Sequence, residues 1–336
     1  MKSAHTLQIA KVLPQGRDAV LLSFVAEDGG APNLSFRPGQ YLTLGADVSG
    51  GEHWRSYSIT SEPSADEPIN VLVRRVAGGV VSNWICDNVR VGQQMRVLPP
   101  AGRFTLALSK EPVLLFAGGS GIAPIFALAR QALAEGAPKV SLFYANRDRA
   151  TAMLIEELTV LSKIAGDRLR IRFWFDDRDG IPTQENLRSA AEGFEDAHVY
   201  LCGPEPFMRA IQACLPEAGF DPARVHQEDF GAPDEDDAGP NAGPAREALL
   251  TVKIKGKIHE VVVNGGGSLL SAMLKAGLQV PHSCKVGECA SCICRLREGD
   301  VERLENSVLD ADDVSQGWIV ACRTRALSKT LRVDFS

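Results

Sequence analysis

Three cysteines close together near the C-terminus constrain this chain most. They lie in the segment PHSCKVGECASC, where Cys284, Cys289 and Cys292 have the spacing C-x4-C-x2-C. A fourth cysteine, Cys322, follows in the segment GWIVACRTR. Three thiolates from one short loop and a fourth from a distant segment form the plant-type ligand pattern of a [2Fe–2S] cluster. The spacing therefore predicts that this loop binds such a cluster.

Two other uses of cysteine fit this arrangement less well. Structural zinc usually takes its ligands from two short Cys or His pairs, whereas here one triplet is matched by a single distant cysteine. A disulfide framework would need paired spacings, which Cys86, Cys202, Cys214 and Cys294 do not show. Reduced thiols are typical of a cytoplasmic protein, and we expect this location.

Length and charge limit the kinds of protein that remain. The 336 residues predict two or three domains, at roughly 100–200 residues each. The net charge of −6 and the lack of Lys/Arg-rich runs argue against a nucleic-acid partner. No apolar run reaches the length of a membrane-spanning helix or of a signal-peptide core, so we expect no membrane segment.

Residues 1–107 contain short β-rich runs and one helical segment, which predicts an antiparallel barrel. One strand, HWRSYSIT, carries Arg55, Ser56, Tyr57 and Ser58. Alternation along a strand places Arg55 and Tyr57 on one face and the two serines on the other. Arginine can bind a phosphate with two hydrogen bonds, and tyrosine can lie flat on an aromatic ring. By itself the motif also fits an ordinary surface strand.

A glycine pair precedes the helical segment, in GGVVSNW. Free backbone amides at a helix start, together with the helix dipole, form an anion site. A simple N-cap at Ser82 after a turn is the alternative.

Residues 108–230 alternate strands with helices, which predicts a parallel α/β sheet. The buried strand VLLFAG is followed by GGSGIAP and a helix, and a glycine loop in this position is typical of nucleotide binding. Ligands of such sheets bind at the carboxyl ends of the strands. We therefore expect residues 118–124, 144–149 and 202–206 to meet there.

The C-terminal part separates into a linker and a third domain. Residues 231–247 are rich in Gly, Pro, Ala and acid, which predicts a flexible linker, with an acidic docking patch at 234–237 as the alternative. Residues 248–336 combine a predicted hairpin, LLTVKIKGKIHEVVVN, with a helix, SLLSAMLKAG, so the cysteine loop lies in an α+β domain.

Taken in order, these motifs identify a family resemblance. RSYSIT, GGVVSNW, PPAGRF, GGSGIAP, YANRD and YLCGPEPFM occur as in the ferredoxin–NADP reductase superfamily. With the cysteine array behind them, the chain, apart from its linker, resembles the reductase components of multicomponent oxygenases that end in a plant-type ferredoxin domain. GGVVSNWICDNVRVG, VLPPAGRF and LFYANRD are most similar to the reductases of 3-ketosteroid 9α-hydroxylase systems, which are Rieske-type oxygenases. The phenylacetyl-CoA epoxidase reductases are near relatives.

The resemblance implies an FAD-binding β-barrel over 1–107, an NAD-binding α/β domain over 108–230 and a β-grasp ferredoxin domain over 248–336. Electrons would pass from NADH through FAD and the [2Fe–2S] cluster to a Rieske-type, non-haem iron oxygenase. A flavin is needed between the other two because a hydride carries two electrons and the cluster accepts one. We expect a monomer.

The resemblance also assigns residues. The flavin would be bound by Arg55, Ser56, Tyr57, Ser58, Gly79, Val81 and Ser82. The nicotinamide nucleotide would be bound by Gly118, Gly119, Gly121, Pro124, Asn146, Arg147, Gly203 and Pro204. Hydride transfer would involve Ser58, Cys202, Glu228 and Phe230. The cluster ligands would be Cys284, Cys289, Cys292 and Cys322.

Several alternatives stay open at this point. Some relatives use FMN, but the anion site at the helix start favours FAD. Arg147 and Arg149 could bind the 2′-phosphate of NADPH, whereas Asp148 and the likeness of YANRD to NADH-using relatives favour NADH. Other functions that fit are a stand-alone flavin diaphorase or ferric reductase, the reductase of a diiron oxygenase, and a redox-sensing [2Fe–2S] module.

Overall fold

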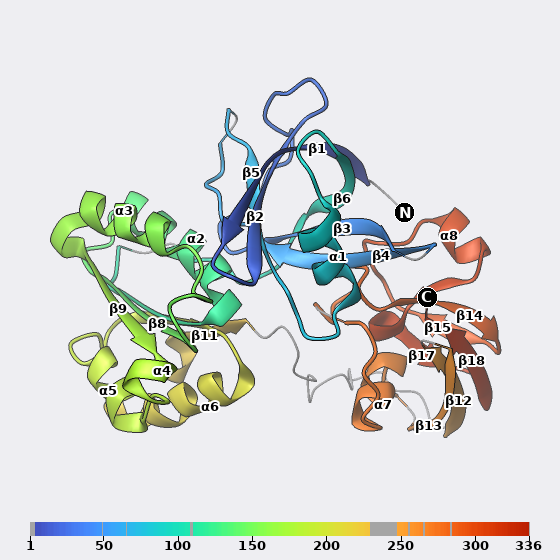
Figure 1. The fold of residues 1–336 in the computed structure, drawn as a ribbon. Coiled ribbons are helices and arrows are strands. Elements are labelled where there is room, and N and C mark those ends of the chain that lie inside the picture. Colours follow the sequence, from blue (N-terminus) through green and yellow to red (C-terminus); the bar gives the residue numbers. More distant parts are fainter. Residues whose placement is uncertain are drawn as a thin grey trace.

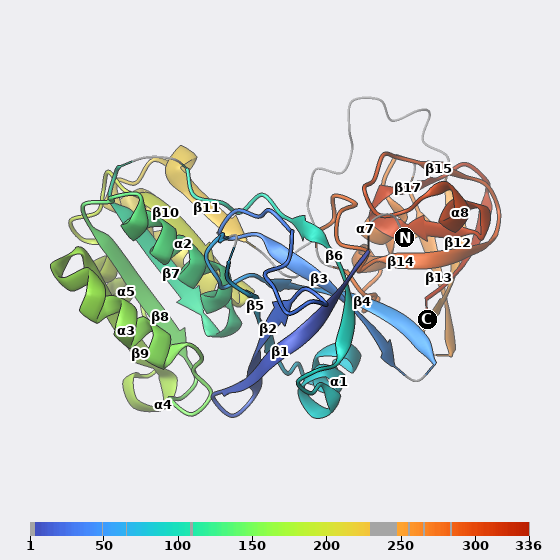
Figure 2. The ribbon, with the colours of Figure 1, turned by 90° about the horizontal axis from the view of Figure 1, so that it is seen from above.

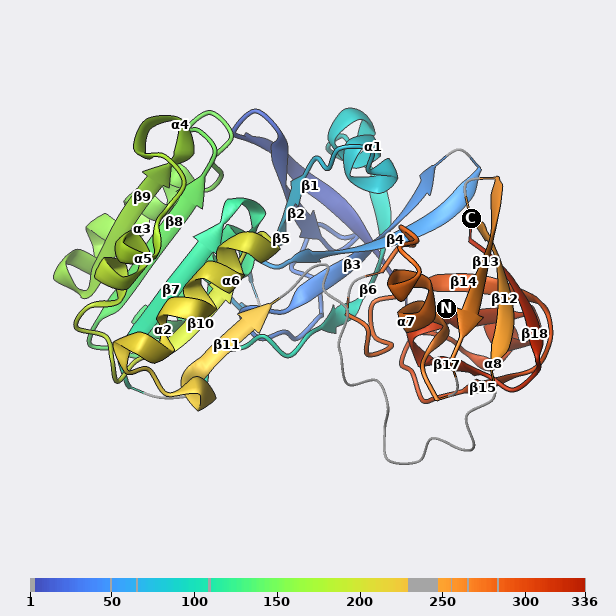
Figure 3. The same cartoon turned by 90° about the horizontal axis from the view of Figure 1, so that it is seen from below.

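The computed structural model describes residues 4–48, 50–64, 66–107, 110–228, 247–254, 256–264, 266–282 and 284–335. Three bodies, each built around one large sheet, make up the molecule (Figure 1). The N-terminal barrel lies between the other two in both perpendicular views (Figures 2 and 3). The fold class expected from the sequence is confirmed.

The barrel consists of six antiparallel strands in the order β4-β3-β6-β1-β2-β5. An isolated bridge between Ile59 and Val71 connects the two ends of this order, and apolar side chains alternate into the interior. The bounds are β1 His5–Gln15, β2 Ala19–Val25, β3 Tyr41–Val48, β4 Gly51–Ser58, β5 Ile69–Arg74, β6 Gln94–Ala101 and helix α1 Val80–Asn88.

The second body is a five-stranded parallel sheet in the order β11-β10-β7-β8-β9. Helices α2 and α3 pack on one face and α5 and α6 on the other, because side chains of β7 alternate between two apolar cores. Strand order reverses between β7 and β10, and such a switch point opens a crevice for ligands.

The bounds in this body are β7 Val113–Gly118, β8 Val140–Asn146, β9 Leu169–Phe175, β10 His198–Cys202 and β11 Val225–Glu228. The α-helices are α2 Ile122–Ala134, α3 Ile155–Ala165, α4 Asp176–Asp179, α5 Gln184–Ala191 and α6 Glu205–Cys214. Short 3-10 turns are η1 Gly119–Gly121, η2 Gly166–Arg168, η3 Pro216–Ala218 and η4 Pro222–Arg224.

The third body has a mixed five-stranded sheet in the order β13-β12-β18-β14-β16, with a small β15–β17 ladder beside it. Its central pair, β12 and β18, is parallel. The bounds are β12 Ala248–Ile254, β13 Lys257–Val263, α7 Leu269–Lys275, β14 Ile293–Glu298, β15 Val301–Arg303, α8 Ala311–Ser315, β16 Trp318–Val320, η5 Ala321–Arg323, β17 Thr324–Ala326 and β18 Thr330–Asp334.

The barrel and the third body share apolar contacts. Trp54 of β4, which is 1% exposed, and Leu98 of β6 belong to a core cluster formed otherwise mainly by the third body. Gly45 leaves room for the indole, since a Cβ there would lie 2.8 Å from the Trp54 ring. Burial of a tryptophan at this junction favours one docked arrangement of the two bodies.

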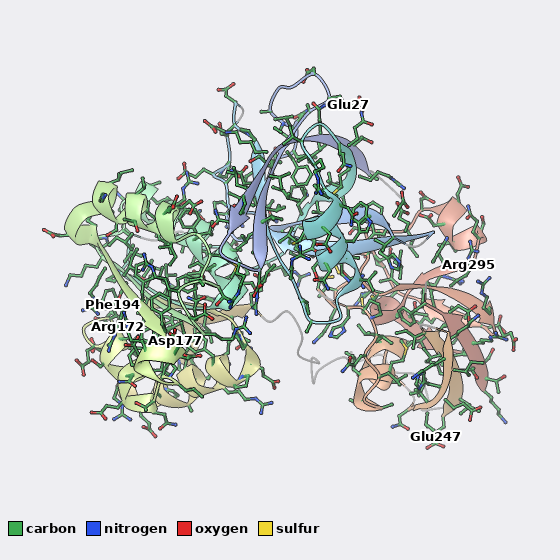
Figure 4. The ribbon with its side chains drawn as sticks, viewed as in Figure 1. Glu27, Arg172, Asp177, Phe194, Glu247 and Arg295 are labelled. Atoms are coloured by element: carbon green, nitrogen blue, oxygen red, sulfur yellow. The ribbon has the colours of Figure 1, made fainter. Side chains whose placement is uncertain are left out.

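The predicted linker, residues 231–247, falls outside the described residues except for Glu247, which Figure 4 places on the third body beside β12. Among the described residues, none of the helices has the length and apolar character required to cross a membrane. All eight cysteines are described, and none forms a disulfide.

Candidate active site

A cavity of about 580 Å³ opens beside β4 and the start of α1. It is lined by all seven residues expected to bind the flavin: Arg55, Ser56, Tyr57, Ser58, Gly79, Val81 and Ser82. Strict alternation predicts that the serines and the Arg55–Tyr57 pair face opposite sides, yet both line this cavity.

The start of α1 leaves its amides open to this cavity. Its N-cap is Gly79, and no side chain caps the first turn. The alternative of a serine N-cap is therefore wrong: the Ser82 hydroxyl accepts a hydrogen bond from the backbone N–H of Val76 at 3.3 Å instead. Uncapped amides at a helix start attract an anion such as a phosphate.

The third body forms one wall of the same cavity. Leu274 of α7 and residues 278–282 line it opposite β4. This wall leads directly into the cysteine loop, which begins at Cys284 after one residue outside the described set. A flavin in the cavity would therefore contact the body that carries the cysteines.

A second cavity, of about 310 Å³, lies at the switch point between β7 and β10. Gly118, Gly119, Asn146, Arg147 and Pro204 line it, as expected from the sequence. The Arg147 guanidinium lies 3.4 Å from a carboxylate oxygen of Asp18 in an exposed ion pair.

The remaining glycine-loop residues pack beneath this cavity. A Cβ at Gly121 would lie 2.0 Å from the carbonyl oxygen of Cys202, and one at Gly203 would lie 2.9 Å from the Gly118 backbone. Pro124 is buried in the first turn of α2. These small residues let the ends of β7 and β10 approach each other closely.

Cys202 and Glu228 are register partners at the ends of β10 and β11. The Cys202 side chain is fully buried. Glu228 Oε2 is inaccessible to solvent and makes no hydrogen bond to any described residue, although the residue as a whole is half-buried. Burial raises the pKa of Glu228 to about 8, so the carboxyl group is mostly neutral at pH 7. Phe230 lies outside the described residues.

Two charged residues near the cavities were missed by the sequence reasoning. Arg74, at the end of β5, lines both cavities, and its guanidinium lies close to Gly119. Asp176, directly after β9, lines the second cavity, and its Oδ1 is buried without a hydrogen-bond partner among the described residues. Burial, and secondly the charge of Asp177, raises the pKa of Asp176. An acidic residue just after a parallel strand, as in FWFDD, was the available signal.

The four cysteines expected to bind the cluster lie together as two pairs. The Cys284 and Cys289 side chains contact each other, and so do those of Cys292 and Cys322. Three of the four are 2% exposed, and Cys284 is half-buried. Within the described ranges, no three Cys, His, Asp or Glu side chains gather as a single-ion site. Two pairs match two irons, each with two thiolates.

The cysteine loop is shaped to present amides to sulfur. The backbone N–H of Glu288 donates to Cys284 Sγ, and the N–H of Cys284 donates to Cys289 Sγ, both at 3.3 Å. Lys285 and Ala290 adopt positive φ angles of 55° and 56°, as does Gly287 at 83°. The Cys289 thiol, together with backbone amides, lowers the pKa of Cys284, and the same contact, with burial, raises the pKa of Cys289. The residues present fit a [2Fe–2S] cluster.

Comparison with known proteins assigns one family model to each of the three bodies. Family models of an oxidoreductase FAD-binding domain, an oxidoreductase NAD-binding domain and a 2Fe-2S iron-sulfur cluster binding domain match residues 15–106, 115–213 and 252–327. The ferredoxin reductase component of 3-ketosteroid-9-alpha-monooxygenase from Rhodococcus rhodochrous is 36% identical over 98% of this chain and 96% of its own. The chain belongs to this family of oxygenase reductase components. A component of 1,2-phenylacetyl-CoA epoxidase from Escherichia coli is 30% identical to the reductase, over 100% of this chain and 98% of its own.

The reductase also resembles a solved structure over nearly its full length. Phthalate dioxygenase reductase, described as a modular structure for electron transfer from pyridine nucleotides to [2Fe-2S], matches with a TM-score of 0.62 and 27% identity. The match covers 99% of this chain and 98% of that one. The expectations of FAD, NAD and a [2Fe–2S] cluster as cofactors, and of an NADH-dependent oxidoreductase, are thereby confirmed.

Proposed function

We propose that this reductase delivers electrons from NADH to a Rieske-type, non-haem iron oxygenase. The observation that carries the proposal is the shared cavity: the wall opposite the flavin strand β4 belongs to the body with the four paired cysteines. When bound, NADH supplies a hydride, FAD divides its two electrons, and a [2Fe–2S] cluster passes them on singly. The chain's own residues position these groups and control their surroundings.

On the flavin side, Tyr57 would lie against the flavin ring and Arg55 would bind a flavin phosphate. Ser58, which is 5% exposed, would donate a hydrogen bond to the ring nitrogen that receives the hydride. The uncapped start of α1, with Gly79 and Ser82, would hold the pyrophosphate, which supports FAD over FMN. Arg74, between the two cavities, would offset phosphate charge on both sides.

On the nicotinamide side, the loop of Gly118, Gly119 and Gly121 would admit the nucleotide phosphates, and Asn146, Gly203 and Pro204 would border them. Cys202 and the neutral Glu228 would orient the nicotinamide, since a protonated carboxyl group can donate to its amide oxygen. Phe230 would cover the flavin ring until the nicotinamide displaces it; this role rests on the family resemblance.

We expect Asp176→Asn to weaken the preference for NADH. A carboxylate in the nucleotide cavity can accept hydrogen bonds from a ribose and repels a 2′-phosphate. The substitution should lower the ratio of kcat/KM for NADH to that for NADPH about tenfold, which corresponds to about 1.4 kcal/mol. Steady-state kinetics with both nucleotides would measure it. Asp177→Asn, next along the chain but not among the residues lining the cavity, is the control. If Asp176→Asn left this ratio unchanged, Asp176 would not contribute to the choice between NADH and NADPH.

We expect Glu228→Gln to remove a pH dependence of stability. The pKa of Glu228 rises on folding from an ordinary 4.5 to about 8, because burial disfavours the charged form. Between these two pH values the unfolded chain loses this proton and the folded chain keeps it. The free energy of unfolding therefore falls as pH rises through this window and levels off above pH 8. Urea unfolding of the apoprotein at several pH values should show a flatter profile for the glutamine variant. If the unfolding free energies of the wild type and the variant changed equally with pH, the Glu228 carboxyl group would have the same pKa in the folded and the unfolded chain.

We propose that the oxygenase is a separate protein and that the reductase acts as a cytoplasmic monomer. Each cofactor would have its own domain, with boundaries at 1–107, 108–230 and 248–336 and a linker at 231–247. The similarity to the reductase component of a monooxygenase and to a component of an epoxidase supports an oxygenase as the acceptor. The paired cysteines support one-electron delivery rather than a flavin diaphorase.

An anaerobic titration of the purified protein with NADH tests the proposal. Visible absorption should show bleaching of the flavin, and low-temperature EPR should show a reduced [2Fe–2S] signal. Oxygen consumption should then become coupled to NADH oxidation only after a Rieske-type oxygenase is added. Flavin bleaching without a cluster signal would instead favour a ferric reductase or diaphorase.

A further inference from the structure

Tyr41 stands between the flavin cavity and the cysteine loop. It begins β3 and is the register partner of Ser58 on β4, which lines the flavin cavity. Its side chain is 6% exposed, and its ring packs against Gly102, where a Cβ would lie 3.0 Å from the ring. The tyrosine is therefore held in place by the barrel.

The Tyr41 hydroxyl is unsatisfied within the barrel. It is inaccessible to solvent and makes no hydrogen bond of standard geometry to any described residue. Burial, and after it the neighbouring Cys284 and Cys289 of the third body, raises the pKa of this hydroxyl, so the hydroxyl lies close to the cysteine loop. Gly102, against which the Tyr41 ring packs, also lines one cavity together with Glu288 of that loop. A buried hydroxyl without a hydrogen-bond partner is unfavourable. The nearby Cys284 sulfur could accept a hydrogen bond from it.

We propose that the Tyr41 hydroxyl donates a hydrogen bond to Cys284 Sγ when the cluster is bound. This bond would raise the reduction potential of the cluster while the barrel and the third body are docked. Donors to a ligand sulfur withdraw negative charge, and reduction adds negative charge. The donor comes from the flavin-binding barrel and the sulfur from the third body. The cluster is therefore the better electron acceptor in the docked arrangement, where the flavin is its neighbour. This inference rests on the proposed cluster ligands.

The test is a redox titration of full-length, cofactor-loaded Tyr41→Phe, followed by EPR. Phenylalanine keeps the ring and removes only the hydroxyl. At a fixed ambient potential the ratio of reduced to oxidised cluster should fall about tenfold, which is ~59 mV for one electron. A ratio within about twofold of the wild-type value would overturn the inference. Absence of any cluster signal in the wild-type protein would overturn the proposed function as well.

Tyr200→Phe is the matched control. Tyr200 is also buried, but its hydroxyl accepts a hydrogen bond from the backbone N–H of Ala107 at 2.7 Å in the second body. The cluster potential should not move in this variant. A second readout on the native protein is electron–nuclear double resonance after exchange into D2O, where one exchangeable coupling should be present in the wild type and absent from Tyr41→Phe. An identical set of couplings in both proteins would contradict the hydrogen bond.

Discussion

Serine in place of Cys289 is expected to remove the cluster absorption and its EPR signal while NADH still bleaches the flavin. Cys289 is 2% exposed and pairs with Cys284, and a serine alkoxide is a poor replacement for a thiolate at iron. Electron delivery to a one-electron acceptor should fall by more than about 100-fold, since losing even an outer partner of a metal site costs 10–100-fold. The flavin cavity contains no part of this side chain.

Cys294→Ala separates ligand loss from general damage. Cys294 is two residues from Cys292 and fully buried, but it lies in β14 and outside the two cysteine pairs. This variant should keep its cluster signal at a modest cost in stability. Stopped-flow absorption and EPR would compare the two proteins. If Cys289→Ser lost NADH-driven flavin bleaching while remaining folded, the separation of the two electron-transfer steps would be wrong.

Gly121→Ala is expected to destabilise the nucleotide-binding region strongly. The new Cβ would lie 2.0 Å from the Cys202 carbonyl oxygen and 2.9 Å from the Gly203 nitrogen, which are backbone atoms and cannot swing aside. One of the two strand ends must move, at a cost of about 3 kcal/mol. The thermal unfolding midpoint should drop by about 10 °C, and NADH affinity should fall because the ends of β7 and β10 shift.

Gly267→Ala is the control for a glycine that is not crowded. Among the described residues, the only neighbour of its added Cβ would be the Asn264 carbonyl oxygen at 3.7 Å, which is an ordinary contact. Calorimetry should find its midpoint within a few degrees of the wild type. Equal midpoints for the two variants would show that the β7–β10 approach is looser than these distances indicate.

Sites whose residues lie close together along the chain could be predicted from the sequence. The cysteine spacing predicted that Cys284, Cys289 and Cys292 gather in one loop, and the glycine loop after VLLFAG predicted a cavity at the switch point, because covalent connection fixes the geometry locally. Arg55 and Gly79 meet in one cavity as expected, although they come from a strand and a helix.

Features made by distant segments could not be predicted. Arg74 lines two cavities, and Tyr41 lies near Cys284, only because the barrel packs against both neighbours. Arg55 and Ser56 both line one cavity, although alternation along β4 predicts that they face opposite sides. Asp176 was signalled by its place after a strand, but its unpaired oxygen is a property of the folded cavity.

The wall that the third body adds to the flavin cavity has a consequence for engineering. A hybrid enzyme made by exchanging the C-terminal segment between two relatives, cut at the linker, would replace Leu274 and residues 278–282 along with the cysteines. Such a graft would change the flavin's own contacts. A working hybrid must therefore keep the contacts between the barrel and the third body, to which Trp54 and Leu98 contribute apolar side chains.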